Sequence, residues 1–580
     1  MTFKRLAEYF ERLEVTSSRL SLIEILSELF KEVSPDEVPM VSYLIQGRVA
    51  PFYEPIEIGM AEKNVAASIA RAYGVEREEV LRDYGRLGDL GKAAQKLNQE
   101  SRIKNQGTML SVKDVFETLK EIAGFSGDGT VEKKISTLSG LIDKVSGVEA
   151  KHLVRIPLGT SRLGIGDPTV LDGFATAKLG EKSKRKILES AYNKVSDLGL
   201  IGKTLWEKGL AGVEKLDVEF GRPIRSQLCE RLPDPKSILE KYQGKAHVQY
   251  KYDGFRIQIH KKGNKVRLFS RNLEETTHMF PDIIEGVLKQ IKADSIILDS
   301  EGLAFNPESE EFLPFQETTK RRRKHGIEEA AKATPLKAFV FDIMYIDGKS
   351  LVDTPLEERL KIMAKAIEGD EVLIEQPGEF IDDPVKMNEM LQEALTKGLE
   401  GLIVKRPDSL YEAGARNFNW IKLKRHSSGE LKDTIDCVIL GYIYGRGKRA
   451  EFGAGALLVG VYDKEKDEFV TVSKIGTGLS DEEWKEIHTR ADKIKVENKP
   501  ARVNAILQPS VWIKPEIVIE VLADEITRSP VHTAGKDGEE SGYALRFPRL
   551  VKFRDADKQA EDSTSVYELK EMYEGQYGKK

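Results

Sequence analysis

Lys251 lies beside a predicted turn, and its residue type and surroundings could support chemistry. Lys251 stands in the string KYDGFR, where Asp253-Gly254 predicts a tight turn that could leave the lysine facing a pocket. A lysine amine that is neutral for long enough can attack a phosphate, provided that cations hold the phosphates and carboxylates hold a divalent metal. Short strings of this kind also occur in surface hairpins, so the lysine alone does not establish a site.

Motifs further along the chain supply the cations and carboxylates that this chemistry requires. They follow Lys251 in the order FSRN, LDSEG, FVFD, EGLIVKR, WIKLK and, near the C-terminus, RFPRLVKFR. Taken singly, a glutamate in such a motif is usually exposed, a phenylalanine usually belongs to a core, and a basic strand usually faces solvent. The series in this order and spacing is far more specific than any one of its members.

Read together, the motifs resemble those of the covalent nucleotidyltransferases, and specifically the archaeal and eukaryotic type of ATP-dependent DNA ligase. The resemblance continues outside them. LVRIPLGTSRLGIGDPTVLDGFA is similar to the helical DNA-binding domain of that family, and YGRGKRAEFGAGALLVGVYD with KIGTGLSDEE is similar to its oligonucleotide-binding domain. The resemblance therefore covers most of the chain.

The resemblance implies a role for each matching residue. Lys251 is the expected nucleophile, which becomes lysyl-AMP. The residues expected around the nucleotide are Gln249, Arg256, Arg271, Glu301, Phe341, Arg416, Lys422 and Lys424. Arg256 and Glu301 match positions near the ribose, and Arg271 matches one at the nucleotide or phosphate edge. Phe341 matches the aromatic residue that stacks on adenine, a role that suits its flat apolar face.

The last strand of the core is expected to bind phosphate. Arg416, Lys422 and Lys424 match the phosphate contacts of the family, and Lys422 and Lys424 alternate on one strand, so both can face the α-phosphate. Glu301 and Glu400 are the expected metal carboxylates. ATP and Mg²⁺ are the implied cosubstrate and metal, with Mn²⁺ as an alternative.

The chain departs from the family pattern at two places. Many relatives carry Glu two residues before the lysine, whereas this chain has Gln249, whose amide can still hydrogen-bond an adenine edge. After RFPR the family usually continues to a compact R-x-D-K. Here the corresponding stretch is Arg554-Asp555-Ala556-Asp557-Lys558, one residue longer. These departures leave open the selectivity for ATP and the roles of Asp555, Asp557 and Lys558.

The activity implied by the resemblance is ATP-dependent sealing of nicks in double-stranded DNA, through lysyl-AMP and DNA-adenylate intermediates. Nicked DNA is the implied partner, a sliding clamp is a further candidate partner, and the protein is expected to be a monomer. Replication, repair and recombination of DNA all need this reaction.

Other functions share part of the pattern. An RNA ligase or an mRNA-capping guanylyltransferase would have the lysine, the carboxylates and the final basic strands, but the long helical N-terminal region argues against both. A non-enzymatic DNA clamp or scaffold would explain the basic stretches, but not a lysine, a stacking aromatic and carboxylates in this order.

Composition indicates a globular protein with local rather than global positive charge. The 580 residues carry a net charge of -5, so any DNA contact must be local. Basic stretches occur at Lys320 to Lys324, at Ala413 to Gly429 and in YALRFPRLVKFR, and each could equally be a solvated face. The two cysteines, Cys229 and Cys437, lie far apart and lack metal-ligand spacing, which argues against structural zinc and a disulfide framework.

The N-terminus carries charges where a signal peptide needs an apolar stretch, and no apolar run approaches the roughly 20 residues that span a bilayer. The expectation is a protein of the cytoplasm, associated with the nucleoid in a prokaryote, that has no membrane partner.

The elements that must position these residues fall into three regions. Residues 1–215 show helical periodicity, as in Phe3, Leu6, Phe10 and Leu13, and predict an all-α DNA-binding domain; Ser34-Pro35-Asp36-Glu37 predicts a helix start. Residues 216–430 combine strand-like runs and a hairpin about Lys262-Gly263-Asn264 with helical segments such as Pro355 to Ile367. They predict an α+β nucleotidyltransferase core with antiparallel sheets. Residues 431–580 are rich in short strands and predict an OB-fold β-barrel.

Overall fold

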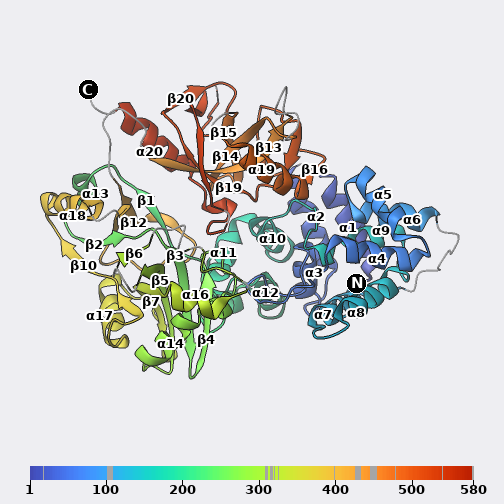
Figure 1. The fold of residues 1–580 in the computed structure, drawn as a ribbon, viewed down its shortest axis with the longest axis horizontal. Coiled ribbons are helices and arrows are strands. Elements are labelled where there is room, and N and C mark those ends of the chain that lie inside the picture. The colour runs from blue at the N-terminus through green and yellow to red at the C-terminus, as the bar shows by residue number, and fades with distance from the viewer. Residues whose placement is uncertain are drawn as a thin grey trace. The chain divides into compact units, whose positions relative to one another are not determined.

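The computed structural model describes the chain except residues 17, 101–108, 307–310, 314–317, 319, 324, 397–398, 425–432, 445–452, 477–478, 539, 555 and 578–580. The chain forms two compact units (Figure 1). The N-terminal unit contains Met1–Tyr192 and Ser196–Leu216, and the C-terminal unit contains Asn193–Val195 and Asp217–Lys580. No helix among the described residues is both long and apolar enough to cross a membrane.

The N-terminal unit is helical, as its periodicity predicts. Its α-helices are α1 (Phe3–Glu14), α2 (Arg19–Glu32), α3 (Val38–Ile45), α4 (Glu62–Tyr73), α5 (Arg77–Leu87), α6 (Leu90–Glu100), α7 (Val112–Gly124), α8 (Thr130–Ile142), α9 (Gly147–Arg155), α10 (Asp167–Phe174), α11 (Arg185–Val195) and α12 (Leu198–Glu214). The four apolar residues of the first predicted stripe, Phe3 to Leu13, are all buried on one face of α1. Burial of such faces is the main driving force for the helical packing.

The predicted helix start at Ser34 is wrong by one turn. The capping contact does form, because the backbone N–H and the hydroxyl of Ser34 donate to Glu37 at 3.2 and 2.8 Å. Residues 35–37 nevertheless form a turn, and α3 begins at Val38 with Pro39 in its first turn. The capping motif therefore closes a turn in front of the helix.

The C-terminal unit begins with a sheet that carries Lys251. Its strands lie in the order β1 (Leu228–Arg231), β12 (Arg416–Leu423), β11 (Gly401–Lys405), β2 (Ala246–Lys251) and β10 (Gly378–Ile381), and only β1 with β12 pair in parallel. The helices α13 (Pro235–Lys241) and α18 (Pro384–Thr396) share an apolar core with one face of this sheet. Its other face is left for the polar side chains of β2, β11 and β12.

A second sheet stands beside the first. It runs in the order β4 (Lys265–Ser270), β3 (Phe255–Lys262), β5 (Ser295–Asn306), β7 (Leu336–Ile346) and β8 (Lys349–Ser350), with β6 (Glu311–Phe312) on β5 and β9 (Leu373–Glu375) on β7. The helices α14 (Pro281–Gln290), α16 (Ile327–Ala333) and α17 (Leu356–Ala366) follow in the same region. The predicted hairpin is confirmed: Lys262 pairs with Lys265 around Gly263, whose φ of 55° suits the turn. The predicted helix from Pro355 is confirmed as α17.

A small apolar cluster joins the two sheets. Phe341 of β7 and Trp420 of β12 pack in it together with Tyr411, and they come from strands far apart in the sequence. This cluster closes the base of a pocket between the sheets. The mixed but mainly antiparallel pairing confirms the α+β class of the core.

A third sheet occupies the C-terminal part of the same unit. Its strands run β16 (Lys495–Val496), β18 (Val511–Ile513), β13 (Thr434–Ile443), β14 (Ala456–Asp463), β15 (Glu468–Ile475) and β17 (Val503–Asn504), with β19 (Val518–Leu522) between β13 and β22 (Arg549–Phe553). A separate ribbon pairs β20 (Glu525–Ser529) with β21 (Gly542–Arg546), and the helices are α19 (Asp481–Lys493) and α20 (Val566–Tyr577). The pairings among described residues do not close a barrel, so the OB-fold barrel stays a prediction.

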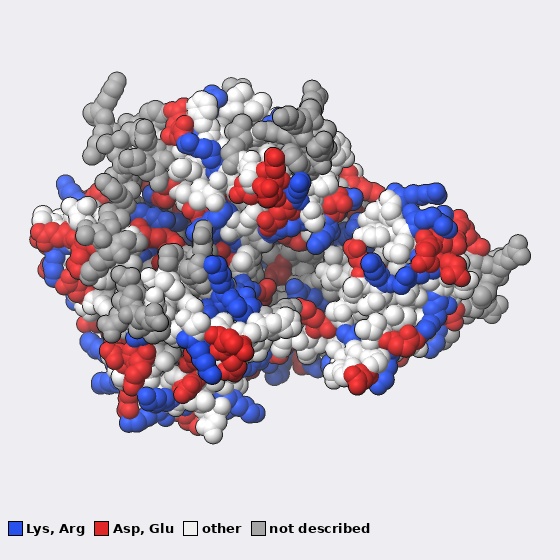
Figure 2. All heavy atoms as spheres, in the orientation of Figure 1, with Lys and Arg blue, Asp and Glu red and all other residues white. Residues whose placement is uncertain are grey.

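Charges of both signs are mixed on the face of the molecule that Figure 2 shows. Figure 2 shows Lys and Arg interspersed with Asp and Glu on the visible face, in line with the small net charge. The predicted basic stretch at Lys320 to Lys324 is not a uniform solvated run, because Arg321 is 2% exposed and pairs with Asp282 at 3.0 Å. Its last residue, Lys324, lies outside the described residues.

Candidate active site

Lys251 ends β2 and enters the pocket because the following turn is packed tightly. A Cβ atom at Gly254 would lie 2.4 Å from the backbone oxygen of Gly302 and 3.0 Å from Cγ of Glu301. Only glycine fits so close to β5. The turn predicted at Asp253-Gly254 thus seats the end of β2 directly against the strand that carries Glu301.

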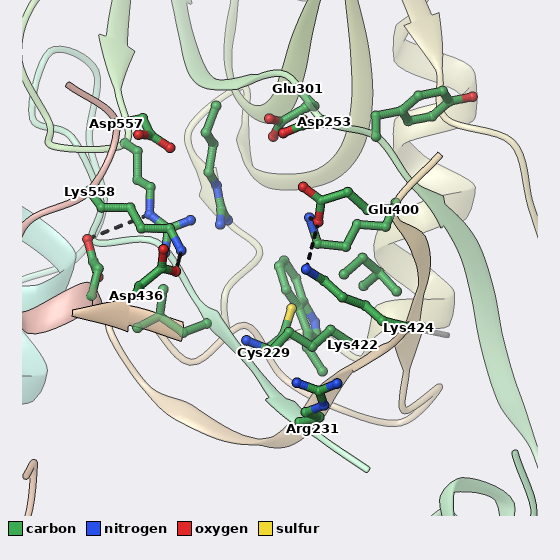
Figure 3. A pocket seen from close by; sticks show the side chains of 18 of the residues that line it. Cys229, Arg231, Asp253, Glu301, Glu400, Lys422, Lys424, Asp436, Asp557 and Lys558 are labelled. Atoms are coloured by element: carbon green, nitrogen blue, oxygen red, sulfur yellow. Dashed lines mark hydrogen bonds and ion pairs between the residues drawn. The ribbon is translucent and has the colours of Figure 1, made fainter. Parts of the chain in front are cut away.

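Glu400 is the carboxylate closest to the lysine. Its Oε2 lies 2.5 Å from Nζ of Lys251 and 3.2 Å from Nζ of Lys424. Glu400 directly precedes β11, and Gly401 has a φ of 141° with no space for a Cβ beside the Leu423 carbonyl. In Figure 3 Glu400 lies between Asp253 and Lys424. The glycine of the EGLIVKR motif therefore brings Glu400 within reach of both lysines.

The carboxylates of the pocket differ in their affinity for protons. Burial raises the pKa of Glu301 to about 7 against the attraction of Lys251 and Arg256. Burial, together with the nearby Glu400 charge, raises the pKa of Asp253 to about 6. Burial acts in the same direction on Glu400, but Lys251 and Lys424 outweigh it and hold its pKa well below the usual value. Glu400 is the carboxylate of the three that stays ionised.

Arg256 is held firmly by groups of the protein. Its guanidinium binds the Asp299 carboxylate through Nε at 2.8 Å and through Nη2, and its Nη1 donates to the Gln227 carbonyl at 3.1 Å. The Tyr411 hydroxyl donates to the same carboxylate at 2.8 Å. Asp299 and Glu301 lie two residues apart on β5, so both face the pocket side of the strand. The sequence reasoning assigned Arg256 but not its partners Asp299 and Tyr411.

Phe341 lines the pocket with only 9% of its surface exposed. Lys405 donates to the Phe341 carbonyl at 2.8 Å, and its ammonium lies 4.8 Å from the centre of the Phe341 ring. Burial lowers the pKa of Lys405 to about 8. The sequence reasoning quoted Lys405 within EGLIVKR but gave it no role, although it fixes the predicted stacking aromatic.

The cations of β12 that are predicted to bind phosphate contact a carboxylate of the C-terminal helix α20. Glu568 in the first turn of α20 pairs with Lys422 at 2.5 Å and also with Arg416. Burial opposes its ionisation, but Arg416 and Lys422 hold the pKa of Glu568 far below its usual value. Arg271 lies 3.6 Å from Asp562, another carboxylate of the pocket wall. No sequence motif pointed to Glu568 or Asp562.

The longer C-terminal basic segment also reaches this pocket. Arg554 binds Asp557 at 2.6 Å and Glu520 at 2.8 Å, and Lys558 pairs with Asp436. Figure 3 shows Lys558, Asp436 and Asp557 at the same cavity as Glu400. Burial lowers the pKa of Lys558 to about 8. The extra residue does not prevent Asp557 and Lys558 from lining the pocket, while Asp555 lies outside the described residues.

The structure therefore brings all of the predicted site residues to one cavity of about 200 Å³. Members of that set on its wall are Gln249, Lys251, Arg256, Arg271, Glu301, Phe341, Glu400, Arg416, Lys422 and Lys424. They come from both sheets of the core. Oxygen ligands such as Glu301 and Glu400 suit Mg²⁺, which is commonly held by one or two carboxylates and completed by substrate phosphates.

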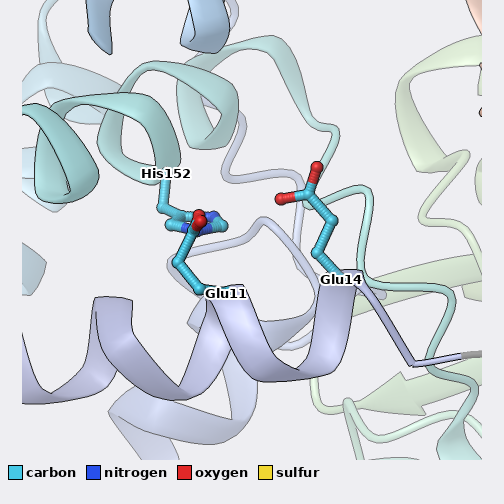
Figure 4. Close-up of side chains that lie close together, drawn as sticks. All are labelled: Glu11, Glu14 and His152. Carbon is cyan, nitrogen blue, oxygen red and sulfur yellow. The ribbon is translucent and has the colours of Figure 1, made fainter.

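A second group of metal-ligand type lies in the N-terminal unit (Figure 4). Oxygen and nitrogen atoms of Glu11, Glu14 and His152 lie within 4.8 Å of one another. The ammonium of Lys151, however, is 2.6 Å from Glu11 and 2.9 Å from Glu14. In this structure the group is an ion network of Glu11, Glu14, Lys151 and His152 that joins α1 to α9.

Family models match three parts of the chain. One described as "ATP dependent DNA ligase domain" matches residues 226–424, and one described as "DNA ligase N terminus" matches residues 2–175. The third, "ATP dependent DNA ligase C terminal region", matches residues 450–558.

Curated relatives align with nearly the whole chain. A "Probable DNA ligase" of Dictyoglomus turgidum is 47% identical over 576 residues, which cover 99% of this chain and 98% of the relative. A "DNA ligase" of Sulfolobus acidocaldarius is 41% identical over 593 residues, which cover 100% of this chain and 99% of the relative. A "DNA ligase" of Nitrosopumilus maritimus is 38% identical, with coverage of 99% and 98%.

Proposed function

The chain belongs to the ATP-dependent DNA ligase family, and on that premise we propose that Lys251 is the residue of this enzyme that AMP modifies. The protein is an ATP-dependent DNA ligase, which joins the 3′-hydroxyl and 5′-phosphate ends of a nick in duplex DNA. One observation carries the assignment of Lys251. Its Nζ atom shares a pocket with the predicted phosphate cations of β12 and with Glu400, which lies 2.5 Å away.

In the first step the neutral Lys251 amine attacks the α-phosphate of ATP. A nitrogen–phosphorus bond forms, the bond to the leaving pyrophosphate breaks, and the amine loses a proton. Glu400 lies 2.5 Å from Nζ and would hold the amine in position, while the released proton passes to solvent. Arg416, Lys422 and Lys424 hold the phosphates in line and stabilise the negative charge that develops in the transition state.

In the second step the 5′-phosphate of the nick takes AMP from Lys251. In the third step the 3′-hydroxyl attacks that activated phosphate, and AMP leaves. Glu301 and Glu400 would hold Mg²⁺, with Mn²⁺ as an alternative, and the ion would neutralise charge on the phosphate oxygens. The position of both carboxylates on the pocket wall, and the ionised state of Glu400, support this choice of ligands.

The nucleotide is proposed to lie with its base at Phe341 and Gln249 and its ribose near Arg256 and Glu301. Arg271 would then contact the phosphate edge. The hydrogen bonds of Arg256 to Asp299 fix the direction of its guanidinium, which supports a positioning role for Arg256.

We propose that the chain has three domains with separate functions. Residues 1–215 would bind DNA, residues 216–430 would form the adenylation domain, and residues 431–580 would form an OB-type domain. The separate compactness of the N-terminal unit supports the first border. The series of short antiparallel strands from β13 to β22 supports the OB-type assignment.

A labelling experiment tests the nucleophile. The protein is incubated with ATP labelled at the α-phosphate and with Mg²⁺, and the covalent label is then located by peptide mapping. We expect one labelled residue, Lys251, and loss of the label when nicked duplex DNA is added. Labelling of another residue would disprove the assignment. Discharge by nicked RNA but not by nicked DNA would favour the alternative of an RNA ligase.

A further inference from the structure

The side chain of Gln249 is buried in the pocket but has no hydrogen-bond partner. It is 1% exposed, and neither its Oε1 nor its Nε2 is bonded within the described structure. Gln249 lies two residues before Lys251 on β2, so both side chains are on the face of the strand that is turned toward the pocket. An unbonded buried amide is unfavourable, which indicates that a ligand supplies its partners.

Other buried glutamines in the same unit have fixed amides. Gln258 accepts a hydrogen bond from the Ile224 N–H at 2.7 Å and donates to the Ile224 carbonyl at 2.9 Å. Gln376, also in the pocket wall, donates to the Tyr250 carbonyl at 2.6 Å. Gln249 is different, because no contact determines which end of its amide faces the cavity. The amide can therefore present either a donor or an acceptor.

Gln227 is an intermediate case, because only one end of its amide is bonded. Its Oε1 accepts from the Glu412 N–H at 3.0 Å, while its Nε2 is buried and unbonded. Gln227 also lines the pocket, and the contact with Glu412 fixes the orientation of its amide. Two neutral amides, one fixed and one free to turn, therefore lie at a pocket that also contains the Phe341 and Trp420 rings. Flat aromatic walls with amide hydrogen-bonding groups suit a purine base.

We propose that Gln249 reads the substituent at position 6 of the purine, and that its rotatable amide lets this ligase use 6-oxopurine as well as 6-aminopurine nucleoside triphosphates. Its Oε1 would accept from an amino group, and its Nε2 would donate to a carbonyl group. A carboxylate at this position could only accept and would repel a carbonyl oxygen. This proposal rests on the proposed role of Lys251.

The covalent step is the same for both kinds of nucleoside triphosphate. The Lys251 nitrogen bonds to the α-phosphorus, the bond to pyrophosphate breaks, and the amine loses its proton. Inosine triphosphate would give lysyl-IMP in place of lysyl-AMP. It differs from ATP at position 6 and in the protonation of the adjacent ring nitrogen, so it isolates the group that Gln249 is proposed to read.

The test compares rates of covalent labelling by ATP, inosine triphosphate and CTP under single-turnover conditions. We expect ATP to be preferred over inosine triphosphate by no more than about tenfold in the unaltered protein, since one rotatable amide can satisfy either group. CTP should label far more slowly. A preference for ATP above about a thousandfold, or labelling by CTP equal to that by inosine triphosphate, would overturn the proposal.

Two variants sharpen the result. Gln249→Glu should increase the preference for ATP by at least about tenfold, because a carboxylate cannot donate to the 6-oxo group. Gln249→Met keeps a similar shape without either hydrogen-bonding group and should slow labelling by both purines to a similar degree. An unchanged preference in Gln249→Glu would contradict the assignment.

The two proposals fail in different ways. Absence of labelling by every nucleotide would disprove the role of Lys251 and this inference with it. Normal labelling by ATP without labelling by inosine triphosphate would disprove only the role of Gln249. If a variant does not fold, as judged by its thermal unfolding, the comparison of donors in the unaltered protein still decides the proposal.

Discussion

At the level of single residues, the predicted phosphate cations are already neutralised by carboxylates of the chain. Glu400 contacts Lys251 and Lys424, and Glu568 contacts Arg416 and Lys422. Cations placed in a largely buried pocket without counter-charges would be costly. The carboxylates therefore keep the pocket stable before a nucleotide enters, and on the proposed binding mode the phosphates would compete with Glu568 for Arg416 and Lys422.

Replacement of Lys251 should separate the first step from the last. In Lys251→Ala we expect covalent labelling from ATP to fall to background, because no other amine is proposed to form the adduct. The remaining residues of the site are unchanged, so DNA that already carries a 5′-AMP at the nick should still be sealed. A gel assay of both reactions measures this, and covalent AMP on the variant would contradict the assignment.

A buried histidine predicts how stability depends on pH. Burial lowers the pKa of His260 to about 3, so the folded state keeps it neutral while the unfolded state binds a proton below about pH 6.5. Stability is therefore lost as the pH falls below 6.5, by about 2 kcal/mol at pH 5 from this group alone.

Urea unfolding of the unaltered protein and of His260→Gln between pH 7.5 and 5 measures this effect. The variant should lose less stability over that range, because glutamine does not titrate. Equal losses in both proteins would show that His260 takes up its proton in the folded state as well.

At the level of secondary-structure elements, helix α20 places Glu568 on the two cations of β12. Ser565 and Glu568 cap the helix reciprocally, with the Ser565 N–H donating to the Glu568 carboxylate at 2.9 Å. Glutamine can serve in such a cap. Glu568→Gln should therefore keep α20 but leave Arg416 and Lys422 without their counter-charge, which should destabilise the nucleotide-free protein by about 3 kcal/mol.

ATP should stabilise Glu568→Gln more than it stabilises the unaltered protein, because its phosphates then supply the missing negative charge. Thermal unfolding with and without ATP measures the difference. Glu574→Gln, on the same helix but 57% exposed at its side chain, is the matched control and should behave like the unaltered protein. A smaller ATP effect in Glu568→Gln than in the control would rule out this competition.

The strands of the core were predictable because alternation and turn residues are local signals. The hairpin around Gly263 and the helix after Pro355 needed only such signals. Local signals also explain where a strand stops: residues 511–522 form two strands, β18 and β19. Pro515 lies between them and lacks the N–H group that a continuous ladder requires.

Site residues were predictable where a motif carries them. Lys251 and Glu400 lie beside glycines whose packing explains the motif itself. Asp299 could have been suspected, since it precedes Glu301 by two residues on the same strand. Glu568 could not, because its contact with β12 arises from tertiary packing between segments about 150 residues apart, and its own surroundings signal only a helix cap.

At the level of the whole molecule, the N-terminal unit has its own compact set of contacts, and none of the predicted nucleotide-binding residues belongs to it. Deletion of residues 1–215 should leave adenylation of Lys251 largely intact. Binding to nicked DNA should weaken strongly, since phosphate contacts dominate affinity and their number would fall. Equal affinities of the truncated and full-length proteins for a nicked duplex would remove the case for a DNA-binding domain.

The largest motion that we infer is that of the C-terminal basic segment, RFPRLVKFR with its extension to Lys558. Only part of RFPRLVKFR and its extension lies at the pocket. Arg554 and Lys558 line it, whereas Arg546 on β21 and Arg549 on β22 are exposed. Since DNA must also reach the proposed lysyl-AMP, we infer that the segment leaves after pyrophosphate departs. Such closures are hinge motions on timescales of roughly microseconds to milliseconds.

Deletion of the chain from about Ser541 should therefore slow adenylation severely while sparing the sealing of pre-adenylated nicks. Lys558→Ala should show the same order of effects with less disturbance, because the deletion also removes β22 from the third sheet. Arg549→Ala is the control, since Arg549 pairs with Asp524 at the exposed edge. Both rates are measured on each protein. Normal adenylation with lost sealing in Lys558→Ala would reverse the argument, because the segment would then serve as a DNA contact and not as part of a closed adenylation site.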